Sequence, residues 1–110
     1  MTENIICEVS QHKGWTVFSL GGSLDKMNAG EVGDRMNASL QQSSQLAVEL
    51  SALEYISSAG IRILLRAGKQ CKAAGKAYAI CGATGFVKEV IEDANLDVLV
   101  EMYPDVEALP

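Results

Sequence analysis

Two short apolar segments flanking one amphipathic helix constrain this chain more than any other feature. Residues 45–50 and 77–81 are apolar runs typical of inner strands of a parallel sheet. Between them a helix is predicted to begin near Ser58, and Gly75 follows its last periodic residue, where a positive φ is often required. A strand-helix-strand unit predicts an α/β fold with right-handed crossovers. The helix positions predicted to face inward are Ile61, Leu64, Leu65, Gly68 and Cys71.

The segments before this unit predict a hairpin and a helix. Residues 5–10 and 15–20 are expected to pair as antiparallel strands at the edge of the sheet, and the Gly21-Gly22-Ser23 sequence (21–23) is expected to end the second strand. Polar residues then lead into a helix over residues 29–42. Its inner face is predicted to consist of Val32, Met36 and Leu40.

The segments after the unit predict two more helices and a last strand. Residues 86–94 are expected to form the first helix, residues 96–100 the strand and residues 104–109 a short terminal helix. The complete order is β-β-α-β-α-β-α-β-α. This order predicts a single-layer, mostly parallel sheet with an antiparallel N-terminal edge strand and helices packed against it. Four side chains of the 86–94 helix are expected to face inward: Phe86, Val87, Val90 and Ile91.

The length of 110 residues predicts one domain, residues 1–110, that is large enough to bury a core without disulfides or metals. Its three cysteines are widely spaced in apolar patterns, which favours buried free thiols. No apolar run reaches the roughly 18 residues that span a bilayer, and the first residues lack a signal-peptide pattern. We therefore expect a cytoplasmic protein with no membrane partner, and nothing in the sequence requires more than a monomer.

The formal net charge of −5 argues against a general nucleic-acid binder, because phosphate contacts need clustered positive charge. Five of the nine cations nevertheless fall in or just after the helix that begins near Ser58. Three interpretations of this basic stripe stay open: a solubilising face, a protein-docking face and a nucleic-acid contact. The stripe consists of Arg62, Arg66, Lys69, Lys72 and Lys76.

No pattern for catalysis is present in the sequence. The only histidine, His12, lies in the predicted hairpin turn, far from the serines that a hydrolase would use. The glycine pair at 21–22 matches neither a Walker loop nor a dinucleotide fingerprint. The C-terminal carboxylates lack the spacing of a metal cage. We therefore expect a protein that is not an enzyme and needs no cofactor or metal.

The remaining conspicuous feature is the serine pair Ser57-Ser58 at the start of the central helix. A hydroxyl there can cap the helix by accepting a bond from one of its free N–H groups. Alternatively, one hydroxyl faces a partner and carries a switchable charge. Ala59 and Gly60 follow, and such small residues leave the backbone open to close approach by another molecule. Both interpretations remain open from the residues alone.

Three motifs together resemble the STAS family, specifically the small bacterial anti-sigma factor antagonists of the sporulation and general-stress type. They are the LGGSLD segment of residues 20–25, the strand ending in VELSALEYI, and the SSAG segment of residues 57–60 with its apolar helix. The resemblance extends from Ile5 to about Val100, with the elements in the expected order. The stretch of residues 50–65 is its most specific part.

The resemblance implies a regulator in a partner-switching circuit. Unphosphorylated, such a protein binds an anti-sigma factor that is also a serine kinase of the GHKL type, which frees the sigma factor. Phosphorylation by that kinase breaks the complex, and a PP2C-type phosphatase restores it. The acceptor serine implied by the motif is Ser58, with Ser57 as second choice, because the family's preceding aspartate is replaced here by Ser57. The implied partner surface comprises Asp25, Ser57, Ser58, Ala59, Gly60 and Arg62.

Two other functions compete with this hypothesis. Domains that resemble this family also act as lipid- or ligand-binding proteins or as accessory domains of transporters, without a role in sigma-factor control. A small hydrolase that uses Ser58 ranks last, because the sequence offers no base.

Phosphorylation of a serine at this helix start is compatible with a folded domain. A phosphate adds about −1.5 to −2 charge, and the dipole and free N–H groups of a helix start can accept it without unfolding the domain.

Overall fold

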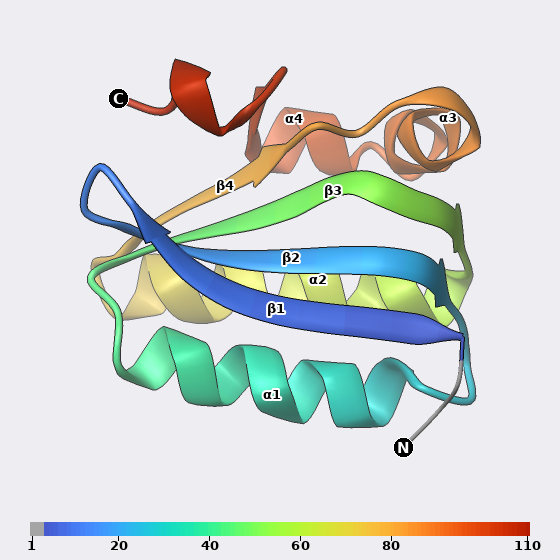
Figure 1. The fold of residues 1–110 in the computed structure, drawn as a ribbon, viewed down its shortest axis with the longest axis horizontal. Helices are drawn as coiled ribbons and strands as arrows, with labels where there is room; N and C mark the ends of the chain where they lie inside the picture. The colour runs from blue at the N-terminus through green and yellow to red at the C-terminus, as the bar shows by residue number, and fades with distance from the viewer. Residues whose placement is uncertain (1–3) are drawn as a thin grey trace.

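A five-stranded sheet in the order β1-β2-β3-β4-β5 forms the centre of the computed structural model, which describes residues 4–110 (Figure 1). Strand β1 (Ile5–His12) pairs antiparallel with β2 (Trp15–Leu24). Each later strand is parallel to its neighbour, which confirms the predicted mixed sheet. These strands are β3 (Gln45–Ile56), β4 (Ala77–Cys81) and β5 (Glu101–Tyr103).

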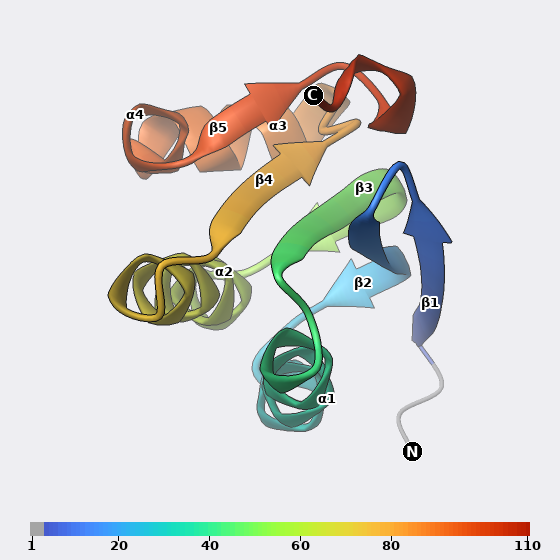
Figure 2. The same cartoon turned by 90° about the vertical axis from the view of Figure 1, so that its left-hand side faces the viewer.

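Helices α1 (Ala29–Gln41) and α2 (Ser58–Ala73) lie side by side on one face of the sheet (Figure 2). Both begin at the edge where the parallel strands β2 and β3 end. Helices α3 (Gly85–Asp93) and α4 (Leu96–Leu99) follow beside β4 and β5. None of the helices in the described residues is long and apolar enough to cross a membrane.

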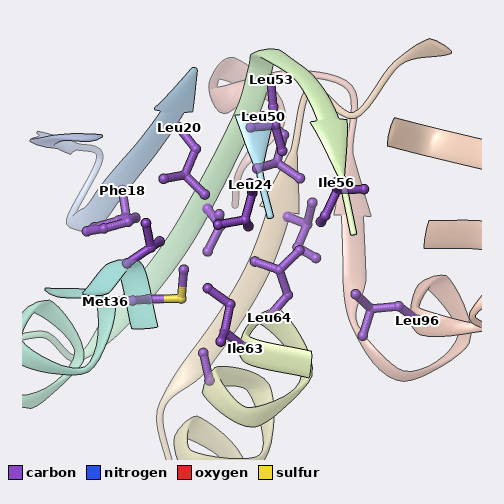
Figure 3. Close-up of a cluster of buried hydrophobic side chains, with 14 of the residues drawn as sticks. Phe18, Leu20, Leu24, Met36, Leu50, Leu53, Ile56, Ile63, Leu64 and Leu96 are labelled. Atoms are coloured by element: carbon purple, nitrogen blue, oxygen red, sulfur yellow. The ribbon is translucent and has the colours of Figure 1, made fainter. Parts of the chain in front are cut away.

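The main core fills the space between the sheet and these helices (Figure 3). The predicted inner face of α1 is confirmed, since Val32, Met36 and Leu40 are all buried. The prediction for α2 was partly wrong, because its buried positions include Ile63 and Ala67, whereas Leu65 and Gly68 are only half-buried. Gly75 has a φ of +71° just after this helix, as the sequence predicts.

A smaller apolar cluster lies on the opposite face of the sheet. It is covered by residues 104–110, here called the C-terminal strap, which contain the 3₁₀ turn η1 (Val106–Ala108) in place of the predicted terminal helix. Leu109 is buried in this cluster, and the indole N–H of Trp15 donates to the carbonyl of Pro110 over 3.1 Å. The cluster consists of Trp15, Val17, Ala47, Ala79, Cys81 and Leu109.

Two predicted element boundaries were wrong. The glycine pair does not end β2, which continues to Leu24 through register shifts at Ser19/Gly21 and Gly22/Ser23. Gly22 has a φ of +91°, and a Cβ there would lie 2.2 Å from the carbonyl oxygen of Asn4. The glycine is therefore required by an irregular strand and not by a turn.

The predicted last strand over residues 96–100 is instead the single helical turn α4, and β5 begins immediately after it at Glu101. Leu96 and Val100 are buried while Val98 and Leu99 are exposed. This spacing of four residues is helical, whereas a strand would bury alternate positions. Phe86 also departs from its prediction, since 50% of it is exposed at the surface of α3.

Candidate functional site

The serine pair lies where the second and third strands of the sheet end together. Leu24 of β2 pairs with Ile56 of β3, so Asp25 and Ser57 emerge side by side from two parallel strands. The backbone N–H of Ser57 donates to the carbonyl of Leu24 over 2.9 Å. The structure thus brings Asp25 and the serine pair together, although the sequence separates them by more than 30 residues.

The two serines occupy different positions at the start of α2. Ser57 is the N-cap residue, and its Oγ accepts a hydrogen bond from the N–H of Gly60 at 3.3 Å. Its side chain is half-buried. Ser58 is the first residue of the helix and is exposed. One hydroxyl therefore satisfies the helix start, and the other remains accessible to a second molecule.

The loop that carries Asp25 is held by reciprocal hydrogen bonds. The Asp25 carboxylate accepts from the N–H of Met27 at 2.9 Å and from that of Asn28 at 3.2 Å. The buried Asn28 side chain accepts in return from the N–H of Asp25 at 2.9 Å and donates to the Ser23 carbonyl at 2.8 Å. This network fixes the loop next to Ser58 before any partner arrives.

The other residues of the predicted partner surface divide into buried and exposed ones. Gly60 is buried, and a Cβ on it would lie 2.7 Å from Cγ1 of Ile56 and 2.9 Å from Cγ of Leu24. The glycine therefore lets α2 approach the sheet and offers no surface of its own. Ala59 is half-buried against the core. Arg62 is exposed and lies one helical turn beyond Ser58.

Ser58 lines a shallow depression of about 400 Å³ together with two exposed apolar side chains, Met27 and Tyr55. Met27 is 76% exposed, and the rings of Tyr55 and Phe86 stack with centroids 5.7 Å apart and planes 9° apart. Such a group of exposed apolar side chains marks an interaction surface more often than isolated ones do. The depression is lined by Asp25, Lys26, Met27, Tyr55, Ser57, Ser58 and Ala59.

Sequence reasoning missed Met27, Tyr55 and Phe86 as members of this surface. Tyr55 precedes the serine pair by two residues, and its place at the end of a long strand is the one signal that could have identified it. Phe86 could not be found from its own pattern, because its helical spacing suggested an inward position. It comes beside Tyr55 only because α3 packs on β3.

The one histidine of the sequence lies away from the exposed serine. His12 lies at the far end of β1, where its Nε2 is 3.5 Å from a carboxylate oxygen of Glu107. Burial raises the pKa of Cys81 to about 11, with smaller contributions from Glu49 and Asp105, so this thiol is protonated at neutral pH. Within residues 4–110 no group of three or more potential metal ligands gathers. The site's chemistry is that of an exposed hydroxyl at a helix start.

Comparisons with known proteins agree with the fold of the chain. The model of the STAS domain family matches residues 7–109. The anti-sigma F factor antagonist of Paenibacillus polymyxa is 25% identical over 102 residues, which cover 91% of this chain and 87% of that protein.

Two solved structures share the fold. An anti-sigma factor antagonist from Mycobacterium paratuberculosis gives a TM-score of 0.87 at 23% identity and covers 94% of this chain and 88% of that one. The phosphorylated form of the Bacillus cell fate determinant SpoIIAA gives a TM-score of 0.71 at 14% identity, with coverage of 94% and 96%.

Proposed function

Because the chain belongs to the STAS domain family, we propose that it is an anti-sigma factor antagonist whose binding is switched by phosphorylation of Ser58. The observation that carries the proposal is that one serine of the pair caps the helix while the other is exposed. Ser57 Oγ already accepts from the N–H of Gly60, whereas Ser58 is exposed in a depression beside Asp25. Modification of Ser58 therefore leaves the helix cap intact.

The proposed switch acts through charge and desolvation at the partner interface. A phosphate on Ser58 adds about −1.5 to −2 charge next to Asp25 and beside the apolar group of Met27, Tyr55 and Phe86. A docked partner protein would have to bury this charge. Burying a charge that has no opposite charge or hydrogen-bond donor to compensate it costs free energy. Moving a two-state equilibrium from 1:99 to 99:1 takes about 5.5 kcal/mol, which is the scale that one buried phosphate can supply.

The proposed partners follow from the same role. The unphosphorylated protein binds an anti-sigma factor that is a serine kinase of the GHKL type, and a PP2C-type phosphatase removes the phosphate. We propose that residues 1–110 act as a single domain, as a monomer and in the cytoplasm, where sigma factors work. The contact surface consists of Asp25, Ser57, Ser58, Ala59 and Arg62, supported from below by Gly60.

The experiment that tests the proposal combines phosphorylation with binding. The purified protein is incubated with the anti-sigma factor kinase of its own organism and ATP, and intact mass with peptide mapping is expected to find one phosphate on Ser58. The variant Ser58→Asp is expected to lose the complex in a titration followed by calorimetry, with an unfolding midpoint close to that of the wild type. Unchanged binding by Ser58→Asp would overturn the proposed switch.

A matched control separates the site from a general effect of charge. Ser44 is another exposed serine, and it lies in the connection between α1 and β3, just before the start of the strand whose other end leads to the serine pair. The variant Ser44→Asp adds the same charge there and is expected to bind as the wild type does. Loss of binding by both variants would indicate general repulsion and would contradict the role of Ser58.

A further inference from the structure

A groove runs between α1 and α2 on the outer side of the helix pair, with a volume of about 310 Å³. Ala29, Gly30 and Gly33 of α1 line it together with Ile63 and Ala67 of α2, while Asp34 and Arg66 bring opposite charges from the two helices. Met36, Asn37 and Gln70 complete the lining.

Gly33 has a packing reason to be glycine, but Gly30 has none. A Cβ on Gly33 would lie 3.3 Å from Cγ2 of Ile63, so the close approach of the two helices leaves little room for a side chain at this position. A Cβ on Gly30 would meet no atom within 4 Å, and its φ is outside the left-handed region. Glycine destabilises a helix relative to alanine. The folded chain alone therefore does not account for the missing side chain of Gly30.

The groove begins at the same end of the molecule as the depression around Ser58, although the two have no lining residue in common. Both helices begin at the same edge of the sheet, so Gly30, the second residue of α1, lies at the same end of the molecule as Ser58 (Figure 1). On α2, Ser58, Arg62 and Arg66 follow one another at four-residue spacing and therefore lie on one stripe of the helix. On the side of α1, Met27 lines the depression, and Ala29 and Gly30 line the groove.

We propose that a helix of the anti-sigma factor partner lies along this groove and places an apolar side chain in the space above Gly30. The inference rests on the proposed function, and it extends the contact surface from Ser58 along the seam between α1 and α2. The volume of the groove is close to the lower limit for small-molecule sites, roughly 300 Å³. Such sites usually enclose their ligand, whereas this groove is open. An amphipathic helix fits it better, with an acidic residue toward Arg66 and a basic one toward Asp34.

The test fills the groove without harming the fold. Calorimetric titration with the anti-sigma factor kinase compares the wild type with Gly30→Leu and Gly30→Ala. Gly30→Leu is expected to weaken binding at least tenfold, and Gly30→Ala, whose methyl group is small, less than threefold. Both variants should keep or raise the urea unfolding midpoint, because glycine is replaced by a better helix former. Arg66→Glu is expected to weaken binding at least fivefold.

Two controls lie outside the groove on the same helices. Ala38→Leu enlarges an exposed residue of α1, and Lys69→Glu reverses an exposed charge of α2. Both are expected to bind within twofold of the wild type. Equal weakening by Ala38→Leu and Gly30→Leu would overturn the inference, since the effect would not be specific to the groove.

The remaining outcomes distinguish this inference from the proposed function. If Ser58→Asp abolishes binding and Gly30→Leu binds as the wild type does, the groove proposal fails and the switch stands. If the wild type does not bind the kinase, both fail. Sedimentation of the free protein adds one more outcome: a dimer that Gly30→Leu dissociates, with kinase binding unchanged, would make a second copy of the chain the occupant and overturn the proposal.

Discussion

The N–H of Ser57 lies 2.9 Å from the carbonyl oxygen of Leu24, and this single hydrogen bond joins the start of α2 to the end of β2. It holds the serine pair at a fixed distance from the Asp25 loop, which has its own network with Asn28. A phosphate on Ser58 would thus arrive at a surface that is already ordered. The proposed switch needs no movement of the core.

The first prediction separates the two serines by stability. Ser57→Ala removes the oxygen that accepts from the N–H of Gly60 and is expected to lower the free energy of unfolding by about 1 kcal/mol. Ser58→Ala removes an exposed hydroxyl and should change it by less than about 0.5 kcal/mol. Urea denaturation of the two variants measures both values.

The same pair also tests the acceptor. Incubated with kinase and ATP, Ser57→Ala is expected to gain one phosphate, and Ser58→Ala none. A phosphate that persists on Ser58→Ala and disappears from Ser57→Ala would assign the modification to the capping residue instead.

The second prediction concerns Gly60, which lies under the start of α2. Gly60→Ala places a methyl group 2.7 Å from Ile56 and 2.9 Å from Leu24, and the overpacking is expected to lower the free energy of unfolding by about 1–3 kcal/mol. Gly30→Ala serves as the control, because its methyl group meets open space and should stabilise the protein by up to about 1 kcal/mol. Thermal unfolding of both variants checks the difference in sign.

The third prediction is a dependence on pH through Tyr78. Its hydroxyl donates to the carbonyl of Leu64 at 2.8 Å, so Tyr78→Phe is expected to lower stability by about 1 kcal/mol at pH 7. Burial raises the pKa of Tyr78 above its ordinary value of 10.0, with a smaller contribution from Cys71. Above pH 10 the unfolded wild type therefore loses a proton that the folded protein keeps.

This difference in proton binding destabilises the wild type by about 1.4 kcal/mol per pH unit above pH 10, and the phenylalanine variant is free of it. At pH 7 the free energy of unfolding of Tyr78→Phe is expected to be below that of the wild type. This difference should shrink above pH 10 and change sign near pH 11. Urea titrations of both proteins at pH 7, 9 and 11 measure the change. A deficit that stays constant with pH would contradict a raised pKa for Tyr78.

The fourth prediction concerns the C-terminal strap. Leu109→Ala opens a cavity in the cluster beneath the strap and is expected to lower the free energy of unfolding by about 2 kcal/mol. Trp15, only 3% exposed and bonded to Pro110, is the single tryptophan, so its fluorescence should shift to the red as the strap loosens. Val98→Ala truncates a side chain that is 78% exposed and should change neither signal.

The succession of strands and helices followed from the sequence because hydrophobic period and turn chemistry agree over most of the chain. The strand β2 shows where this agreement stops. Gly21 and Gly22 are turn residues by composition, yet Gly22 sits inside a bulged strand, where the carbonyl of Asn4 leaves no room for a side chain. That close approach joins residues that are distant along the chain, and local propensity carries no information about it.

The C-terminal region shows a different limit. Residues 96–100 are rich in aliphatic side chains, which suggested a strand, but such a short apolar run has no period that excludes a helical turn. Tertiary packing favours the helical turn, since Leu96 and Val100 are buried and the two residues before Val100 are exposed. The strand that completes the sheet is the three-residue β5, too short to leave a pattern.

The candidate site was partly visible in the sequence. The serine pair stands out as small polar residues at the predicted start of a helix, whereas Asp25 was identified only through the family resemblance. The parallel pairing of β2 and β3 brings them together. The aromatic stack of Tyr55 and Phe86 was not predictable, because it depends on how α3 packs on β3. That a side chain at Gly30 would meet no other atom can be seen only from the three-dimensional structure.

The two described ends of the chain lie at opposite edges of the sheet, which matters for the design of binding assays. The carbonyl of Asn4 accepts from the N–H of Ser23 at 2.7 Å, next to the Asp25 loop, whereas Pro110 lies against Trp15 at the β1–β2 hairpin (Figure 1). An affinity tag before Asn4 would crowd the surface around Ser58. A fluorophore or surface linkage after Pro110 leaves that surface free, so immobilised protein should be attached from this end.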